Sequence, residues 1–125
     1  RRNIDDQQVQ MLGTSGTVTT LAAINLNLLN YRRDLIDGIK LTFDQINRST
    51  IKLNRASYAE RCTMPCIGEE RAELIIPGCG ILEAICSKWP VGRLRVADRG
   101  LREGIILELM FKNGIKMTGN PALNN

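Results

Sequence analysis

The sequence holds 125 residues, 43% hydrophobic and 24% charged, which is the size and mixture of one globular domain and excludes a disordered chain. Its 17 basic and 13 acidic residues give a net charge of +4, which suits an anionic partner, but a supply of five aromatic residues disfavours nucleic acid. No apolar run approaches the roughly 20 residues of a membrane span and no signal-peptide pattern opens the chain, so we expect a cytoplasmic protein without a membrane partner.

The first half of the chain predicts strands that alternate with helices. Residues 8–13 alternate as a strand, and the apolar run over 16–29 predicts a helix that is buried on more than one side. Residues 35–41 are typical of a second strand, bulged at its glycine. Thr42 is a suitable N-cap for a helix over residues 43–53.

The middle of the chain predicts two further helical regions. Ser57 can cap a short helix that ends before Pro65, with Glu60 completing a capping box. The long apolar stretch over 69–89 contains Pro77, which removes a helical hydrogen bond and bends a helix. We therefore expect two packed helical pieces or one kinked helix in the core.

The last predicted elements are a strand over 93–97 and a helix over 101–112. The apolar residues expected to face the core from this helix are Ile105, Ile106, Leu109 and Met110. Strands that alternate with helices predict an α/β domain with a largely parallel sheet.

Four cysteines raise the question of a metal site. The spacing of Cys62, Cys66, Cys79 and Cys86 matches no common zinc motif, and the chain has no histidine. Cys79 and Cys86 lie in an apolar helical pattern, where cysteine behaves as a small hydrophobe. We expect reduced core thiols and no metal ligands.

Two joints between a strand and a helix carry glycine and polar residues, at Gly13 to Thr17 and at Asp98 to Gly104. In parallel sheets, ligands bind beyond the carboxyl ends of strands. The first joint lacks the lysine of a Walker loop, so it is either an anion site at a helix N-terminus or only a capped helix start. At the second joint a lone aspartate at a strand end, Asp98, is commonly a helix cap, and the alternative is a metal or acid/base role.

Three segments together resemble the Ppx/GppA family of exopolyphosphatases and guanosine pentaphosphate phosphohydrolases. They are "LGTSGTVTTLAAI", "ERCTMPCIGEERAELIIPGCGILEAI" and "RLRVADRGLREGIILELM". The resemblance implies an α/β, ribonuclease H-like domain of the actin-like ATPase superfamily. Residues 1–112 would be the C-terminal part of the second of two such domains, and 113–125 a loosely ordered tail. Because the first residue is Arg1 and not Met, we expect a fragment or a processed product.

The resemblance also implies a substrate site. Gly13, Ser15, Gly16 and Thr17 match the family's loop that faces the cleft between domains, where they would hold phosphate or ribose. Arg71 matches a family arginine near the cleft mouth and would pair with phosphate. The alternative for Arg71 is a surface ion pair with a neighbouring glutamate.

The activity implied by the family is hydrolysis of phosphoanhydrides in inorganic polyphosphate, guanosine pentaphosphate or both. Mg²⁺ and a water-activating carboxylate would take part, but no segment here resembles the family's catalytic loops. We therefore expect no catalytic residue and no metal ligand in this chain, and no turnover by the chain alone. A non-catalytic interaction or sensing module is the alternative, and a homodimer stays open.

Overall fold

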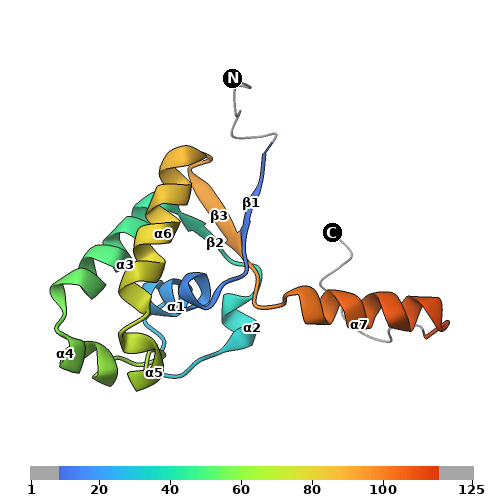
Figure 1. Ribbon diagram of the computed structural model, residues 1–125, viewed down its shortest axis with the longest axis horizontal. Helices are drawn as coiled ribbons and strands as arrows, with labels where there is room; N and C mark the ends of the chain where they lie inside the picture. Colours follow the sequence, from blue (N-terminus) through green and yellow to red (C-terminus); the bar gives the residue numbers. More distant parts are fainter. Residues whose placement is uncertain (1–8, 116–125) are drawn as a thin grey trace.

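A computed structural model describes residues 9–115, in which a small sheet is covered by helices (Figure 1). The elements in chain order are β1 (Met11–Gly13), α1 (Gly16–Asn25), α2 (Arg33–Ile36), β2 (Lys40–Thr42), α3 (Phe43–Arg55), α4 (Tyr58–Thr63), α5 (Glu69–Ala72), α6 (Ile75–Lys88), β3 (Arg93–Val96) and α7 (Leu101–Lys112). The predicted α/β class is confirmed.

The sheet has three strands in the order β1-β3-β2. β1 pairs with β3 in parallel, with Met11 opposite Leu94, whereas β2 pairs with β3 in antiparallel orientation, with Leu41 opposite Leu94. The expectation of a largely parallel sheet is therefore wrong. The helices between β2 and β3 connect the two strands so that they run in opposite directions. Only the β1–β3 half has the parallel geometry that places two helix starts at one edge.

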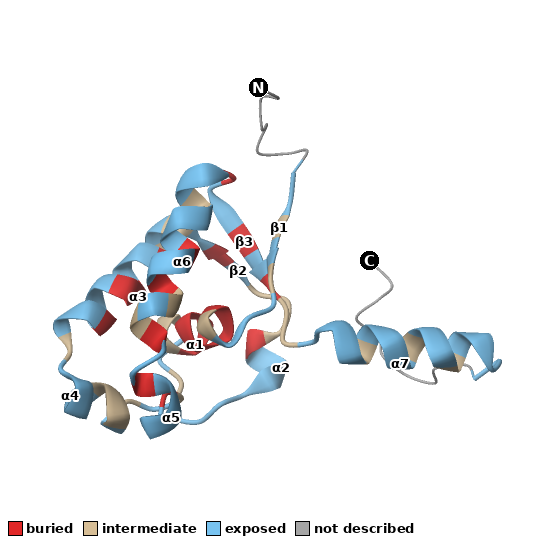
Figure 2. Cartoon of the chain, viewed as in Figure 1, coloured by how far each residue is buried: buried red, intermediate tan, exposed pale blue. Residues whose placement is uncertain are grey.

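α1 is the centre of the core. Its residues 18–23 are all buried, and the helix contacts β3, α3 and α6, as the red segment in Figure 2 shows. This confirms that the apolar run is covered on more than one side. Burying a leucine such as Leu21 completely contributes roughly 1.5–3 kcal/mol relative to leaving it exposed.

α1 ends at Asn25, four residues before the predicted end. Asn27 takes a left-handed φ of 52°. The N–H of Leu28 donates to the carbonyl of Ala23 at 3.0 Å, and the N–H of Asn27 donates to that of Ile24 at 3.0 Å. This pair of bonds is a Schellman motif, which closes a helix at an asparagine or glycine.

The strand predicted over 35–41 is wrong in its first half. Residues 33–36 form α2, and only Ile36 of this turn is buried. Gly38 has a φ of 88° and redirects the chain, and its N–H donates to the carbonyl of Val96 at 2.8 Å. The regular strand β2 therefore starts only after the glycine, at Lys40, and is short.

The predicted N-terminal caps are confirmed. Thr42 Oγ1 accepts from the N–H of Gln45 at 3.2 Å and begins α3, which runs two residues past the expected end. Ser57 and Glu60 form the capping box of α4, with bonds of 3.2 and 2.6 Å, and α4 ends before Pro65 as expected.

The apolar stretch over 69–89 forms two helices, α5 and α6, which confirms one of the two expected arrangements. The break lies at residues 73–74 and not at Pro77, so the proline does not cause it. Pro77 is the third residue of α6, where a backbone N–H has no acceptor within the helix. A proline is tolerated there without bending the helix.

α7 has the predicted bounds but the opposite environment. It extends away from the sheet in Figure 1, and none of its residues is buried. Ile105, Ile106 and Leu109, expected to face the core, are exposed, with 56% of Ile106 accessible. No part of residues 9–115 packs over this helix. The predicted tail is described only as far as Ile115, and the rest of it lies outside the described residues.

The cysteines lie as the core interpretation expects. Cys79 is buried on α6, and Cys62, Cys66 and Cys86 are half-buried against the same apolar cluster. All four are free thiols. Within residues 9–115, no helix has the length and apolar character needed to cross a membrane.

Candidate functional site

The two glycine-containing joints lie side by side, because β1 and β3 are adjacent parallel strands that end at the same level. Gly13 is opposite Val96 in the register, and the N–H of Ala97 donates to the carbonyl of Gly13 at 2.8 Å. The chain then leaves β1 into α1 and leaves β3 towards α7. This is the position beyond the carboxyl ends of strands that the sequence predicts for a ligand.

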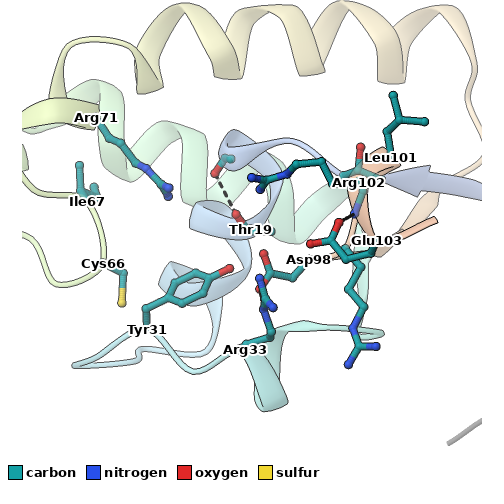
Figure 3. Close-up of a pocket in the computed structure, with 14 residues that line it drawn as sticks. Thr19, Tyr31, Arg33, Cys66, Ile67, Arg71, Asp98, Leu101, Arg102 and Glu103 are labelled. Carbon is teal, nitrogen blue, oxygen red and sulfur yellow. Dashed lines mark hydrogen bonds and ion pairs between the residues drawn. The ribbon is translucent and has the colours of Figure 1, made fainter. Parts of the chain in front are cut away.

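A pocket of about 670 Å³ opens at this edge of the sheet, within the range of small-molecule sites (Figure 3). It is lined by residues of both joints and of the loops before α2 and α5: Thr14, Gly16, Thr19, Tyr31, Arg33, Cys66, Ile67, Arg71, Asp98, Arg99, Gly100, Leu101, Arg102 and Glu103. Four arginines face two carboxylates, so the lining carries a positive excess that favours an anion.

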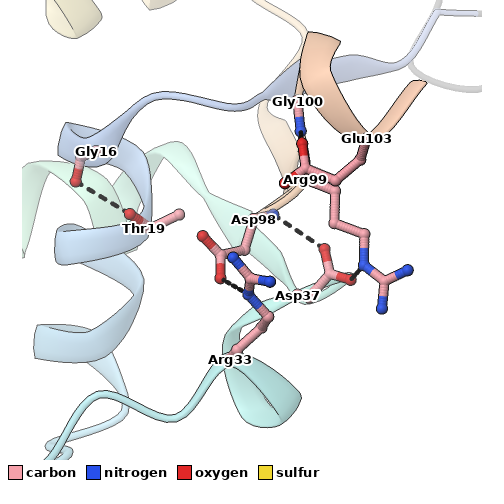
Figure 4. Close-up of polar contacts among 8 residues, drawn as sticks. All are labelled: Gly16, Thr19, Arg33, Asp37, Asp98, Arg99, Gly100 and Glu103. Carbon is pink, nitrogen blue, oxygen red and sulfur yellow. Dashed lines mark hydrogen bonds and ion pairs between the residues drawn. The ribbon is translucent and has the colours of Figure 1, made fainter. Parts of the chain in front are cut away.

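Two of the charged groups are already engaged with one another (Figure 4). Arg33 Nε lies 2.6 Å from Asp98 Oδ2, and this pair raises the pKa of the Arg33 guanidinium further. The Asp98 side chain is only 16% exposed. Asp37 fixes the same strand end, since its Oδ1 accepts from the backbone N–H of Asp98 at 3.0 Å. Asp98 is thus a structural carboxylate of the pocket floor.

The other carboxylate caps α7. The Glu103 side chain accepts from the backbone N–H of Gly100 at 2.8 Å, and this bond lowers the pKa of the Glu103 carboxyl. Arg102, the next residue, lines the pocket and has no carboxylate partner within 4.0 Å in residues 9–115. Its positive charge therefore remains available to a ligand.

Arg71 reaches the pocket from α5. Its Nη1 lies 3.3 Å from Thr20 Oγ1, a residue of α1 that is 51 positions away. No carboxylate of the described chain lies within 4.0 Å of it, so the alternative of a surface ion pair with Glu69 or Glu70 is wrong. The guanidinium is held over the start of α1 with its charge unpaired.

The predicted loop residues divide between two faces of the turn. Gly16 lines the pocket together with Arg71, and a Cβ on Gly16 would lie 3.9 Å from the Arg71 guanidinium carbon. Gly13, Ser15 and Thr17 line a separate hollow of about 350 Å³ on the α6 side. The structure brings Gly16 and Arg71 together and places the other three residues at the second hollow.

Each of these three residues also has a structural role. A Cβ on Gly13 would lie 2.9 Å from both methyl groups of Val18, so only glycine fits there. Ser15 Oγ accepts from the N–H of Val18 at 3.3 Å and caps α1. Thr17 packs against Gly78 of α6, which leaves no room for a larger residue at position 78.

The backbone of the turn offers more to a ligand than these side chains do. Within residues 9–115, the N–H groups of Gly16 and Thr17 have no acceptor, as is usual in a first helical turn. These amides carry the positive end of the α1 dipole, which attracts phosphate oxygens.

A family model described as the Ppx/GppA phosphatase family matches residues 2–113. The chain belongs to the Ppx/GppA phosphatase family. An Aquifex aeolicus member of known crystal structure is 30% identical, with a TM-score of 0.79, and the match covers 84% of this chain and 35% of that one. An exopolyphosphatase from Cytophaga hutchinsonii matches in fold, with 22% identity, a TM-score of 0.67, and coverage of 86% and 35%.

A Haemophilus influenzae protein with the name "Putative exopolyphosphatase" is 25% identical to this chain. The match covers 79% of this chain and 29% of that protein. The chain thus spans about a third of the length of these relatives. The family's fold confirms the predicted ribonuclease H-like, actin-like class, and its chemistry is that of phosphatases.

In this Ppx/GppA chain the sequence did not indicate Tyr31 or Arg33 as site residues. Tyr31 comes from the loop between α1 and α2, and Arg33 is the first residue of α2. The burial of Tyr31 and its contact with the Asp98 carboxylate raise the pKa of the tyrosine hydroxyl. The sequence offered only composition as a guide: Tyr31 is one of few aromatic residues, and Arg33 belongs to a basic pair. Composition does not show that either residue lies near the pocket.

The carboxylates that line the pocket of this Ppx/GppA chain already have partners. In residues 9–115 no three histidine, cysteine, aspartate or glutamate side chains come together as a candidate metal group. The Asp98 carboxylate is committed to Arg33, and that of Glu103 to Gly100.

Proposed function

We propose that this chain is part of a phosphoanhydride hydrolase that releases phosphate from inorganic polyphosphate, guanosine pentaphosphate or both. The observation that carries the proposal is the pocket between the two joints, where Arg71 and Arg102 lie beside unpaired amides at the start of α1. Membership of a phosphatase family supports the same chemistry.

In this proposal the chain positions and neutralises phosphate groups. Arg71 donates to phosphate oxygens as a planar fork, and the Gly16 amide beside it donates to the same group. Charge that develops during hydrolysis is then met by donors already in place. The water-activating carboxylate and the Mg²⁺ ligands belong to parts of the longer protein outside this chain, so the chain alone releases no phosphate.

The test is a phosphate-release assay on the full-length protein with each substrate, with this chain alone as comparison. Arg71→Ala removes a charge-assisted contact worth roughly 1.5–3 kcal/mol, which corresponds to about a ten- to hundredfold loss in kcat/KM. Lysine at position 71 restores only part of it. Arg55→Ala is the control, because Arg55 is exposed at the end of α3 and outside the pocket.

A second variant separates the turn from its packing. Gly16→Val adds a side chain towards Arg71 without a backbone conflict, so activity falls far more than the melting temperature does. If activity and melting temperature fall together, Gly16 is needed for folding and not for substrate binding. Absence of phosphate release from the full-length protein, with phosphate binding retained, would favour the non-catalytic module.

A further inference from the structure

Arg71 reaches the pocket from a short element that does not fix its side chain. α5 is a single turn of four residues, and the guanidinium stands at the end of a long, flexible side chain. Fixing such a side chain in one conformation costs rotamer entropy, which some contact has to offset. A contact outside α5 therefore holds the guanidinium beside the start of α1.

The contact comes from Thr20, a residue that the sequence did not indicate. Arg71 Nη1 donates to Thr20 Oγ1 at 3.3 Å, and this is the hydrogen bond that the Arg71 side chain makes within residues 9–115. Thr20 is 0% exposed, in the buried part of α1. Figure 3 shows the Arg71 side chain extending towards α1, on which Thr19 is labelled. The guanidinium is thus tied to the helix at the centre of the core.

The acceptor is neutral, which distinguishes Arg71 from Arg33 in the same pocket. Arg33 Nε lies 2.6 Å from the Asp98 carboxylate, so the charge of Arg33 is compensated. A hydroxyl orients a guanidinium but brings no negative charge to it. Arg71 is therefore held in place while its positive charge and all but one of its N–H donors remain available to an anion.

The same helix carries the backbone amide that faces the pocket. Gly16 lies one turn before Thr20 on α1, so the two residues share a face of the helix. A Cβ on Gly16 would lie 3.9 Å from the guanidinium carbon of Arg71. Because the amide and the hydroxyl belong to one helix, the contact with Thr20 also sets how far the guanidinium lies from the Gly16 amide. Donors that are placed in advance stabilise developing charge more than mobile ones do.

We propose that Thr20 is a positioning residue, whose hydroxyl holds the Arg71 guanidinium beside the Gly16 amide with its charge uncompensated, so that both donors meet one phosphate group. Thr20 is not among the residues that line the pocket, so it acts through Arg71. This inference rests on the proposed function and deepens it, because it names what gives Arg71 its place.

A double-mutant cycle in the full-length protein tests this role. Thr20→Val keeps the shape of a buried β-branched side chain and removes the acceptor. Calorimetry measures the affinity for inorganic tripolyphosphate, and phosphate release gives kcat/KM. With Arg71 present, Thr20→Val lowers both quantities by about 3- to 30-fold, within the coupling seen between residues that share a hydrogen bond. In the Arg71→Ala protein the same substitution changes them by about twofold or less, because no guanidinium remains to be held.

Three variants control the cycle. Thr20→Ser keeps the hydroxyl and retains most of the affinity, whereas Thr20→Ala lacks the acceptor and gives the same pattern as Thr20→Val. Thr50→Val, at a buried threonine of α3 outside the pocket, changes neither quantity.

A threonine that only packs in the core acts in the same way whether or not Arg71 is present. Losses of equal size with and without Arg71, or no loss in Thr20→Val, would therefore overturn the positioning role. Absence of phosphate release, with the coupling still present in tripolyphosphate binding, would overturn the proposed function alone. Absence of tripolyphosphate binding by the unmodified protein would overturn both.

Discussion

α1 and α7 follow adjacent parallel strands, begin at the same pocket and are both rich in apolar residues, yet their surroundings are opposite. α1 has six consecutive buried residues, and α7 has none. The apolar composition of a helix therefore does not decide whether the rest of the described chain covers it. In residues 9–115, α1 is covered and α7 is not.

The largest expected effect comes from a matched pair of leucine-to-alanine substitutions, one in each helix. Leu21→Ala, at a fully buried position of α1, lowers the free energy of unfolding of this chain by about 2–5 kcal/mol, because it removes packed atoms and leaves a cavity. Leu109→Ala on α7 changes it by about 0.5 kcal/mol or less. Urea denaturation measures both.

The same pair can be repeated in the full-length protein. If Leu109→Ala lowers the free energy of unfolding of the full-length protein nearly as much as Leu21→Ala does, another region of that protein covers α7. A large loss already in this chain would instead contradict the exposed position of α7.

Glycines at the two joints sharpen the contrast at a smaller scale. Gly13→Ala places a Cβ against the Val18 methyl groups and lowers stability by about 1–3 kcal/mol through overpacking. Gly104→Ala, inside α7 with open space around it, leaves stability unchanged or raises it by about 0.5–1 kcal/mol. Thermal unfolding of both variants ranks them. A larger loss of stability in Gly104→Ala than in Gly13→Ala would contradict the tight packing around Gly13.

The cap of α1 contributes less than its core. Ser15→Ala removes the acceptor for the N–H of Val18, and the expected loss is about 1 kcal/mol of unfolding free energy. Asparagine or aspartate at position 15 retains most of it, because each supplies an equivalent oxygen. Loss of the same size in Ser15→Asn would mean that serine is needed for something other than the cap.

The smallest effect is pH-dependent and confined to α7. The pKa of Glu103 is lowered in the folded chain by the Gly100 N–H, so its contribution is complete above the unfolded pKa of about 4.3 and is lost as pH falls through the folded pKa. The protection of the amides in the first turn of α7, measured as the exchange rate relative to the intrinsic rate at the same pH, therefore falls below this range. The protection of α1, which a neutral serine caps, does not change, and Glu103→Gln removes the pH response of α7.

The sequence predicted features that depend on neighbouring residues. Thr42, Ser57 and Glu60 act as expected because a cap needs only the next three positions. The placement of the site beyond two strands was also predictable, since glycine and polar residues follow each strand. Family resemblance added Arg71, which neither spacing nor composition singles out.

Features that depend on the whole chain were not predictable. Leu35 and Ile36 have strand-like character, but the left-handed Gly38 and the register with β3 decide where pairing starts. Tyr31 enters the pocket because α1 ends early at Asn25 and the left-handed Asn27 redirects the chain, and no local pattern reveals where the chain then leads. The outward position of α7 is of the same kind.

The register of Gly13 against Val96 has a consequence for measurement. The walls of the pocket come from segments more than 80 residues apart, which are adjacent only while β1 and β3 are paired. A ligand of this pocket therefore binds the folded chain and not the unfolded one, and it must raise the unfolding free energy by mass action. At a hundredfold excess over its Kd the gain is about 2.7 kcal/mol. A melting curve can thus rank ligands of this pocket without any turnover.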